Sequence, residues 1–124
     1  MILDNSASMY YPQVENLTID SLNKIGFSVL AIAALMNVLK RQRDAVGLSI
    51  YSDGYKYYAP EKGSERHFQM LLAQLSDIGM EKNPPKETKT YTYLHQIAEK
   101  IKRRSLIFLF TDMFQADKNE EELF

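Results

Sequence analysis

The feature of this chain that most constrains its fold is the alternation of short apolar runs with longer segments of helical period. Apolar residues that recur every three or four positions predict helices, and short apolar runs bounded by turn residues predict strands. The expected helices cover residues 18–42, 65–76 and 90–102, and the expected strands cover residues 1–4, 46–51, 55–59 and 105–110. An alternation of this kind predicts an α/β protein with a doubly wound, mostly parallel sheet.

Two of the predicted strands have a distinct character. The segment Ser105–Phe110 is almost continuously apolar, which is typical of a parallel strand covered on both faces. We therefore expect it to be central, buried on both faces and parallel to the strand of residues 1–4. The strand at 55–59 follows the turn Ser52-Asp53-Gly54 and is expected to fold back as an antiparallel edge strand ended by Pro60.

A cluster of oxygen-bearing side chains follows the first predicted strand. The stretch Asp4-Asn5-Ser6-Ala7-Ser8 comes directly after Ile2-Leu3. Alternate side chains of an extended segment point the same way, so one carboxylate and two hydroxyls converge. Such an all-oxygen set suits Mg²⁺ and does not suit zinc or copper. The alternative interpretation is an ordinary turn stabilised by Asp and Ser side chains.

Two further oxygen donors lie far along the chain. Thr88 precedes the predicted helix at 90–102, and Asp112 follows the predicted strand at 105–110. Ligand sites in open α/β sheets lie at the carboxyl ends of the strands. If the first and last strands are neighbours, the carboxylates of Asp4 and Asp112 meet at one rim, to which the loop of Thr88 could return.

The combination of a D-x-S-x-S stretch, a distant Thr and a distant Asp resembles the metal-ion-dependent adhesion site of von Willebrand factor A-type domains. Four stretches narrow this resemblance to the bacterial DUF58 family, and it spans essentially the whole chain. These stretches are Leu3-Asp4-Asn5-Ser6-Ala7-Ser8-Met9, Arg41-Gln42-Arg43-Asp44-Ala45-Val46-Gly47-Leu48, Arg103-Arg104-Ser105-Leu106 and Phe110-Thr111-Asp112-Met113.

The resemblance implies a three-layer A-type fold that carries Mg²⁺, or Mn²⁺ or Ca²⁺. It implies that the hydroxyls of Ser6, Ser8 and Thr88 bind the metal directly, whereas Asp4 and Asp112 act largely through water. Thr90 and Thr92 remain alternatives to Thr88. One coordination position would be left for an acidic side chain of a protein partner. Members of the family are often encoded beside MoxR-type AAA+ ATPases, so such an ATPase is the expected partner.

Composition limits the remaining possibilities. A chain of 124 residues is one domain at most, and a net charge of −1 gives no electrostatic case for nucleic acid or an anionic membrane. The absence of cysteine fits a cytoplasmic setting, and no apolar run is long enough to span a membrane. The A-type fold normally continues beyond a helix like that begun at 119–124, so we expect an incomplete domain that self-associates as a dimer.

Catalysis has little support in the sequence. There is no glycine-rich phosphate loop and no nucleophile elbow, so the chain is not expected to be an enzyme. One alternative is a Mg²⁺-dependent phosphoryl-transfer enzyme with Asp4 as nucleophile, although such enzymes carry a second aspartate where this chain has Ser6. Another is a structural domain without bound metal. His67 and His95 are expected to be partly exposed on helices and to bind no metal.

Overall fold

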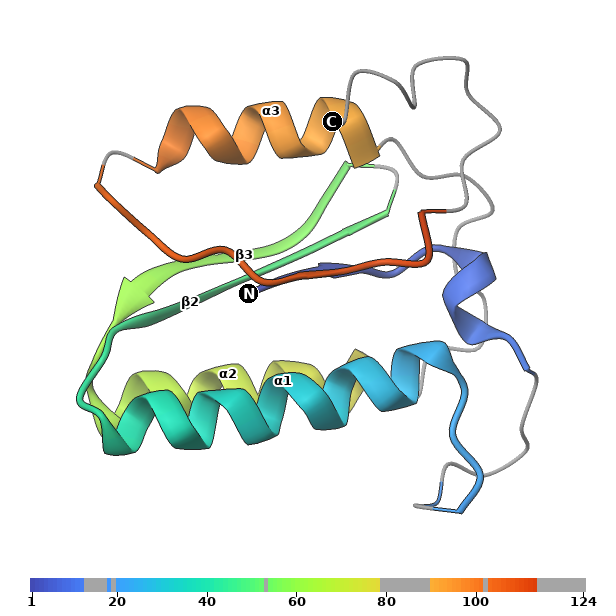
Figure 1. Cartoon of the computed structure of the whole chain (residues 1–124), viewed down its shortest axis with the longest axis horizontal. Helices are drawn as coiled ribbons and strands as arrows, with labels where there is room; N and C mark the ends of the chain where they lie inside the picture. Colours follow the sequence, from blue (N-terminus) through green and yellow to red (C-terminus); the bar gives the residue numbers. More distant parts are fainter. Residues whose placement is uncertain (13–17, 19, 53, 79–89, 102, 114–124) are drawn as a thin grey trace.

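The computed structural model shows an α/β protein with one four-stranded mixed sheet in the order β3-β2-β1-β4 (Figure 1). It describes residues 1–12, 18, 20–52, 54–78, 90–101 and 103–113. The strands are β1 (Ile2–Asp4), β2 (Val46–Ser52), β3 (Gly54–Lys62) and β4 (Leu109–Phe110). The α-helices are α1 (Lys24–Arg41), α2 (Glu65–Ile78) and α3 (Thr90–Lys100), and a short 3-10 helix, η1, covers Ala7–Tyr10. This element order is the one that the apolar pattern predicts.

Three of the strands run in the same direction. β1 pairs in parallel with β2 on one side, with Leu3 opposite Ile50, and with β4 on the other, with Leu3 opposite Phe110. The predicted parallel direction of the first and last strands is therefore confirmed, and the two strands are neighbours. β3 pairs antiparallel with β2 and forms one edge of the sheet. It continues past Pro60 to Lys62, because a residue without an N–H group is tolerated at a sheet edge.

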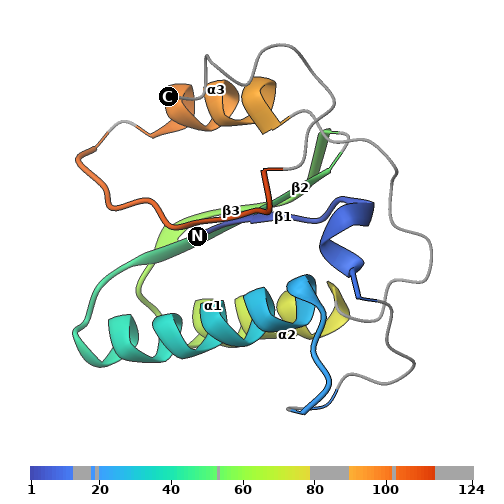
Figure 2. The ribbon, with the colours of Figure 1, turned by 45° about the vertical axis from the view of Figure 1, so that its right-hand side comes forward.

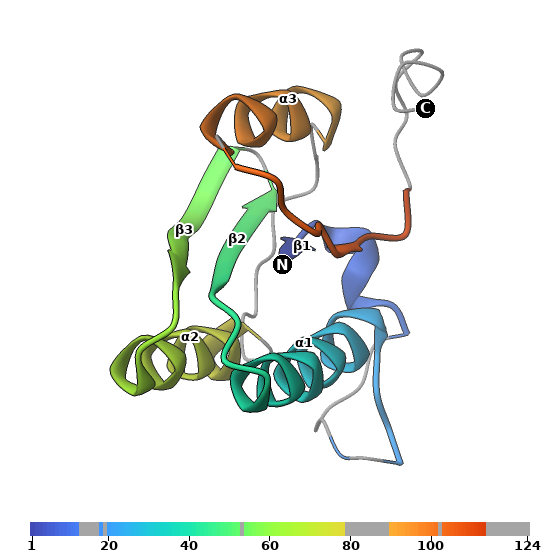
Figure 3. The ribbon, with the colours of Figure 1, turned by 60° about the vertical axis from the view of Figure 1, so that its left-hand side comes forward.

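The helices lie on both faces of the sheet, with α1 and α2 together on one side and α3 on the other (Figure 3). The larger core lies under α1 and α2, and its fully buried side chains include those of Leu3, Ile25, Ile32, Leu48 and Leu71. The smaller core lies under α3, where the ring of Tyr93 stacks on the buried ring of Tyr51 with centroids 4.4 Å apart. No helix among the described residues is both long and apolar enough to cross a membrane.

The start of α1 differs from the prediction. The helix begins at Lys24 rather than near Thr18, and Asn23 caps it by accepting a 2.8 Å hydrogen bond from the backbone N–H of Gly26. The asparagine side chain satisfies an N–H group that the first turn would otherwise leave unpaired. Ser64 caps α2 in a similar way, since its hydroxyl accepts a 3.2 Å hydrogen bond from the backbone N–H of His67.

The expectation of a central last strand, buried on both faces, is wrong. Only Leu109 and Phe110 form β4, and β4 lies at the sheet edge opposite to β3. The side chain of Leu106 is 77% exposed, and Ile107 is also exposed. A run of apolar residues cannot specify which neighbours cover it. Here β1 borders β4 on one side, and no described strand borders it on the other.

His67 is also placed differently from the prediction. It is buried on α2, and its Nε2 lies 2.7 Å from the carbonyl oxygen of Val46 at the start of β2. A buried carbonyl needs a donor, and the imidazole supplies one across the helix–sheet interface. His67 is therefore a structural residue of the core. His95 lies exposed on α3, as predicted.

Candidate metal centre

The loop that follows β1 forms the base of the candidate site. Asp4 is the last residue of β1, and its side chain is fully buried. Its Oδ1 accepts a 3.0 Å hydrogen bond from the backbone N–H of Ser6, which turns the chain sharply out of the strand. The chain then enters η1, which lies at the end of the sheet next to the start of α1 (Figure 2).

The hydroxyls of Ser6 and Ser8 point toward one another, with their Oγ atoms 3.2 Å apart. Two adjacent ligands of an octahedral ion are separated by about 1.4 times the metal–oxygen distance. That product is about 2.9 Å for Mg²⁺ and roughly 3.3–3.7 Å for Ca²⁺. The separation of the two hydroxyl oxygens lies between these values, so their spacing is compatible with two adjacent ligands of one cation.

A buried polar contact that the sequence analysis missed supports this loop. The hydroxyl of Tyr10 lies 2.6 Å from Oδ1 of Asn5 and 3.0 Å from the carbonyl oxygen of Ile78, at the end of α2. The backbone N–H of Asn5 donates a 2.7 Å hydrogen bond to the carbonyl of Tyr51. Asn5 is fully buried, so these contacts fix the loop between β2 and α2 and hold Ser6 in place.

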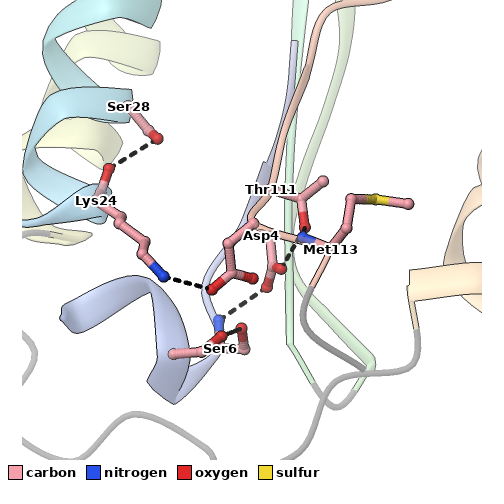
Figure 4. A network of polar contacts seen from close by, with 8 residues as sticks. Asp4, Ser6, Lys24, Ser28, Thr111 and Met113 are labelled. Carbon is pink, nitrogen blue, oxygen red and sulfur yellow. Dashed lines mark hydrogen bonds and ion pairs between the residues drawn. The ribbon is translucent and has the colours of Figure 1, made fainter. Parts of the chain in front are cut away.

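The segment after β4 reaches the same rim. The hydroxyl of Thr111 donates a 2.7 Å hydrogen bond to Oδ2 of Asp4 and accepts a 3.0 Å bond from the backbone N–H of Met113 (Figure 4). Met113 has a φ of 58°, a left-handed conformation that costs a residue other than glycine about 1 kcal/mol. The turn is held by Thr111, which thereby connects the two ends of the site.

Asp112 lies within this turn, and a lysine from α1 reaches it. The Nζ of Lys24 is 3.0 Å from Oδ2 of Asp112. The Asp112 side chain is only 10% exposed, whereas that of Lys24 is 45% exposed. This ion pair joins the first turn of α1 to the end of β4. Sequence reasoning did not identify Lys24 as part of the site, since no local pattern connects residues so far apart in the chain.

The electrostatics of the rim are dominated by Asp4. Burial raises the pKa of its carboxyl group, and the nearby carboxylate of Asp112 raises it further. Hydrogen bonds from Thr111 and Ser6 act in the opposite direction and lower the pKa, but they do not cancel the effect of burial. The folded protein thus holds a carboxylate that would be better solvated in water.

The structure brings four of the five predicted site residues to one rim: Asp4, Ser6, Ser8 and Asp112. The fifth, Thr88, lies outside the described residues. Of the alternatives to it, Thr92 is exposed on α3, and the side chain of Thr90 lies outside the described residues. The donors brought together are carboxylate and hydroxyl oxygens, a set that fits a hard divalent cation.

A family model described as "Protein of unknown function DUF58" matches residues 1–123. The chain belongs to the DUF58 family. No curated protein and no solved structure matched the chain in the corresponding comparisons. The DUF58 match includes both ends of the rim, from the Asp4 loop to the turn at Asp112.

Proposed function

We propose that this DUF58 domain is a metal-dependent protein-interaction module with the three-layer A-type fold. In this proposal a Mg²⁺ ion, or Mn²⁺ or Ca²⁺, lies at the rim between β1 and β4. The hydroxyls of Ser6, Ser8 and Thr88 bind the ion, and Asp4 and Asp112 hold its water molecules.

One observation carries the proposal: β1 and β4 are parallel neighbours, so that their carboxyl ends meet. As a result Asp4 and Asp112, which are separated by most of the chain, lie close enough for one carboxylate to raise the pKa of the other. Two carboxylates beside two converging hydroxyls make a local excess of negative charge and oxygen donors. A divalent cation neutralises that charge and satisfies those donors.

The donor set also indicates what the bound ion would do. Both oxygens of Asp4 already accept hydrogen bonds, from Ser6 and Thr111, so the direct protein ligands are mainly neutral hydroxyls. An ion held by few direct charges keeps a strong attraction for a further carboxylate. Mg²⁺ would thus accept an Asp or Glu side chain of a protein partner at an open coordination position. By the family resemblance, that partner acts with, or is, a MoxR-type AAA+ ATPase in the cytoplasm.

The alternative of phosphoryl transfer with Asp4 as nucleophile has weaker support. A nucleophilic carboxylate needs an oxygen that a substrate can approach, but Asp4 is fully buried and both its oxygens accept hydrogen bonds. The neighbouring position that would carry the second aspartate of such enzymes is occupied by Ser6.

Calorimetric titration with Mg²⁺ and with Mn²⁺ tests the proposal. The wild type and an Asp77→Ala control, which removes an exposed carboxylate of α2, should bind one ion, and Asp112→Ala should bind it much more weakly. An assay with a generic phosphate ester and Mg²⁺ should show no turnover. Absence of binding to the wild type up to about 10 mM, beyond the weak end of protein cation sites, would refute the proposal. Turnover that Asp4→Asn abolishes would favour the enzyme instead.

A protein partner can be sought with the same variants. Proteins that co-purify with wild-type protein in Mg²⁺ and are lost both with EDTA and in Asp112→Ala are those expected to bind through the ion. If a MoxR-type ATPase binds equally with and without Mg²⁺, the domain contacts it through another surface.

A further inference from the structure

Lys24 occupies an unusual position for a cationic residue, because its ammonium group reaches the rim proposed to hold a metal ion (Figure 4). Its Nζ lies 3.0 Å from Oδ2 of Asp112, a side chain that is almost buried. A divalent cation and this ammonium group would compete for the same carboxylate.

We propose that Lys24 is an internal cation that holds Asp112 in the metal-free protein, so that metal binding at this rim is an exchange in which Lys24 leaves Asp112. This inference rests on the proposed metal site and adds a regulatory element to it. Lys24 would offset one of the two carboxylate charges when no metal is bound, and it would lower the apparent affinity for metal.

The surroundings of Lys24 permit the exchange. Its side chain is 45% exposed, so the ammonium group can move into water without burying a charge. The ring of Tyr11, which is itself 68% exposed, also lies near the ammonium group, with its centroid 5.8 Å from Nζ. An aromatic face at this distance attracts a cation. The ring of Tyr11 would therefore still attract the ammonium group once it had left Asp112.

The exchange also has a structural consequence. Lys24 is the first residue of α1, and its backbone N–H donates a 3.1 Å hydrogen bond to the carbonyl of Tyr11. The ion pair joins this first turn to the segment after β4. Release of the ammonium group would remove that connection between the two elements. Metal binding would thus change the contacts of the first turn of α1 as well as those of the rim.

Lys24→Met is the variant that tests the exchange, because it keeps an unbranched side chain and removes the charge. Lys40→Met is a matched control: Lys40 lies on the same helix, about 24 Å away along its axis, and is also paired with an acidic residue, Glu65. Both variants change the net charge equally. Lys24→Arg is the conservative variant, since a guanidinium group retains the ion pair and can make it bidentate.

Mg²⁺ affinity should be measured by calorimetry in all four proteins. We expect Lys24→Met to bind Mg²⁺ about two- to fivefold more tightly than wild type, the order expected for removal of a competing partly exposed ion pair. Lys40→Met and Lys24→Arg should bind no more tightly than wild type. Without metal, Lys24→Met should also melt at a lower temperature than wild type, and Mg²⁺ should raise its melting temperature by more.

The possible outcomes separate the two proposals. Equal or weaker Mg²⁺ binding by Lys24→Met than by wild type would overturn the exchange and leave the metal site standing. An equal gain in Lys40→Met would show that only net charge matters, and would also overturn it. Binding by none of the four proteins would refute the proposed function and the exchange with it.

Discussion

Replacement of Asp4 by asparagine should make the metal-free protein more stable while it removes the response to metal. Asparagine has nearly the same shape, and its side-chain oxygen can still accept the hydrogen bond from the N–H of Ser6. Its amide group can donate to the hydroxyl oxygen of Thr111, which at present donates to Asp4. The substitution therefore keeps the local contacts and removes a fully buried charge.

The magnitude follows from the hydrogen bonds that Asp4 makes. A carboxylate has about four acceptor sites, and among the described residues Ser6 and Thr111 fill no more than three of them. An unfilled acceptor site in a buried group costs about 1–3 kcal/mol. Removal of the charge should thus stabilise the fold by about 1–2 kcal/mol, because asparagine keeps the bonds to Ser6 and Thr111 in a weaker, uncharged form. For 124 residues this corresponds to about 4–8 °C in melting temperature.

The pH dependence provides a second test with a definite sign. The pKa of Asp4 is raised in the folded protein, so the folded state binds this proton more tightly than the unfolded state. The contribution of Asp4 to stability therefore falls as the pH rises from its ordinary pKa, 3.8, through the raised folded value, and it is level above that value. Asp4→Asn should lack this component.

Thermal unfolding followed by circular dichroism in EDTA and in Mg²⁺, from pH 4 to pH 8, measures the change in stability, the response to metal and the pH dependence. Asp77→Asn, at an exposed site of α2, controls for the change in net charge. The reasoning would be refuted if Asp4→Asn melted below wild type in EDTA at pH 7, or if Mg²⁺ stabilised it as much as wild type.

Three further substitutions test separate parts of the structure by chemical or thermal unfolding. Thr111→Val should lower the free energy of unfolding by about 2 kcal/mol and weaken Mg²⁺ binding, because it removes the hydrogen bonds to Asp4 and Met113. Thr111→Ser should keep the wild-type stability and Mg²⁺ affinity, so equal stability of the Val and Ser variants would contradict this. Gly47→Ala should lower the free energy of unfolding by about 1–3 kcal/mol, since the added Cβ would lie 2.9 Å from the carbonyl oxygen of Ala59 in β3. An unfolding midpoint equal to that of wild type would show that β2 and β3 can move apart at this position. Leu106→Asp should change stability by no more than about 0.5 kcal/mol, because Leu106 is 77% exposed, and failure to fold would show that it is covered in solution.

The parts of the fold that the sequence predicts are those that depend on local patterns. The helical period of 65–76 and the cap at Ser64 predict α2 almost to its ends. The start of α1 was also encoded locally, by Asn23 followed three residues later by Gly26, but the apolar period before it obscured that signal. The carboxyl-end position of Asp4 and Asp112 followed from strand direction alone.

The remaining features depend on contacts between distant residues. The burial of His67 depends on its contact with the carbonyl of Val46 in β2. The exposure of Leu106 depends on which elements pack against the segment before β4, and among the described strands β4 borders β1 alone. The ion pair of Lys24 with Asp112 joins residues 88 positions apart and has no local signature. Thr111 is the one site residue that could have been found from its neighbours, since a threonine directly before an aspartate at a strand end commonly forms a side-chain-stabilised turn.

The most direct test of the central claim, that the rim between β1 and β4 holds a divalent cation, is anomalous diffraction from crystals soaked in Mn²⁺. The account predicts an anomalous peak about 2.1–2.2 Å from the hydroxyl oxygens of Ser6 and Ser8, a distance slightly longer than that of Mg²⁺. Asp4 and Asp112 should lie on the same side of the ion, and Lys24 should have moved away from Asp112. A strong peak elsewhere on the protein, or an unchanged Lys24–Asp112 ion pair with no peak at the rim, would contradict the account.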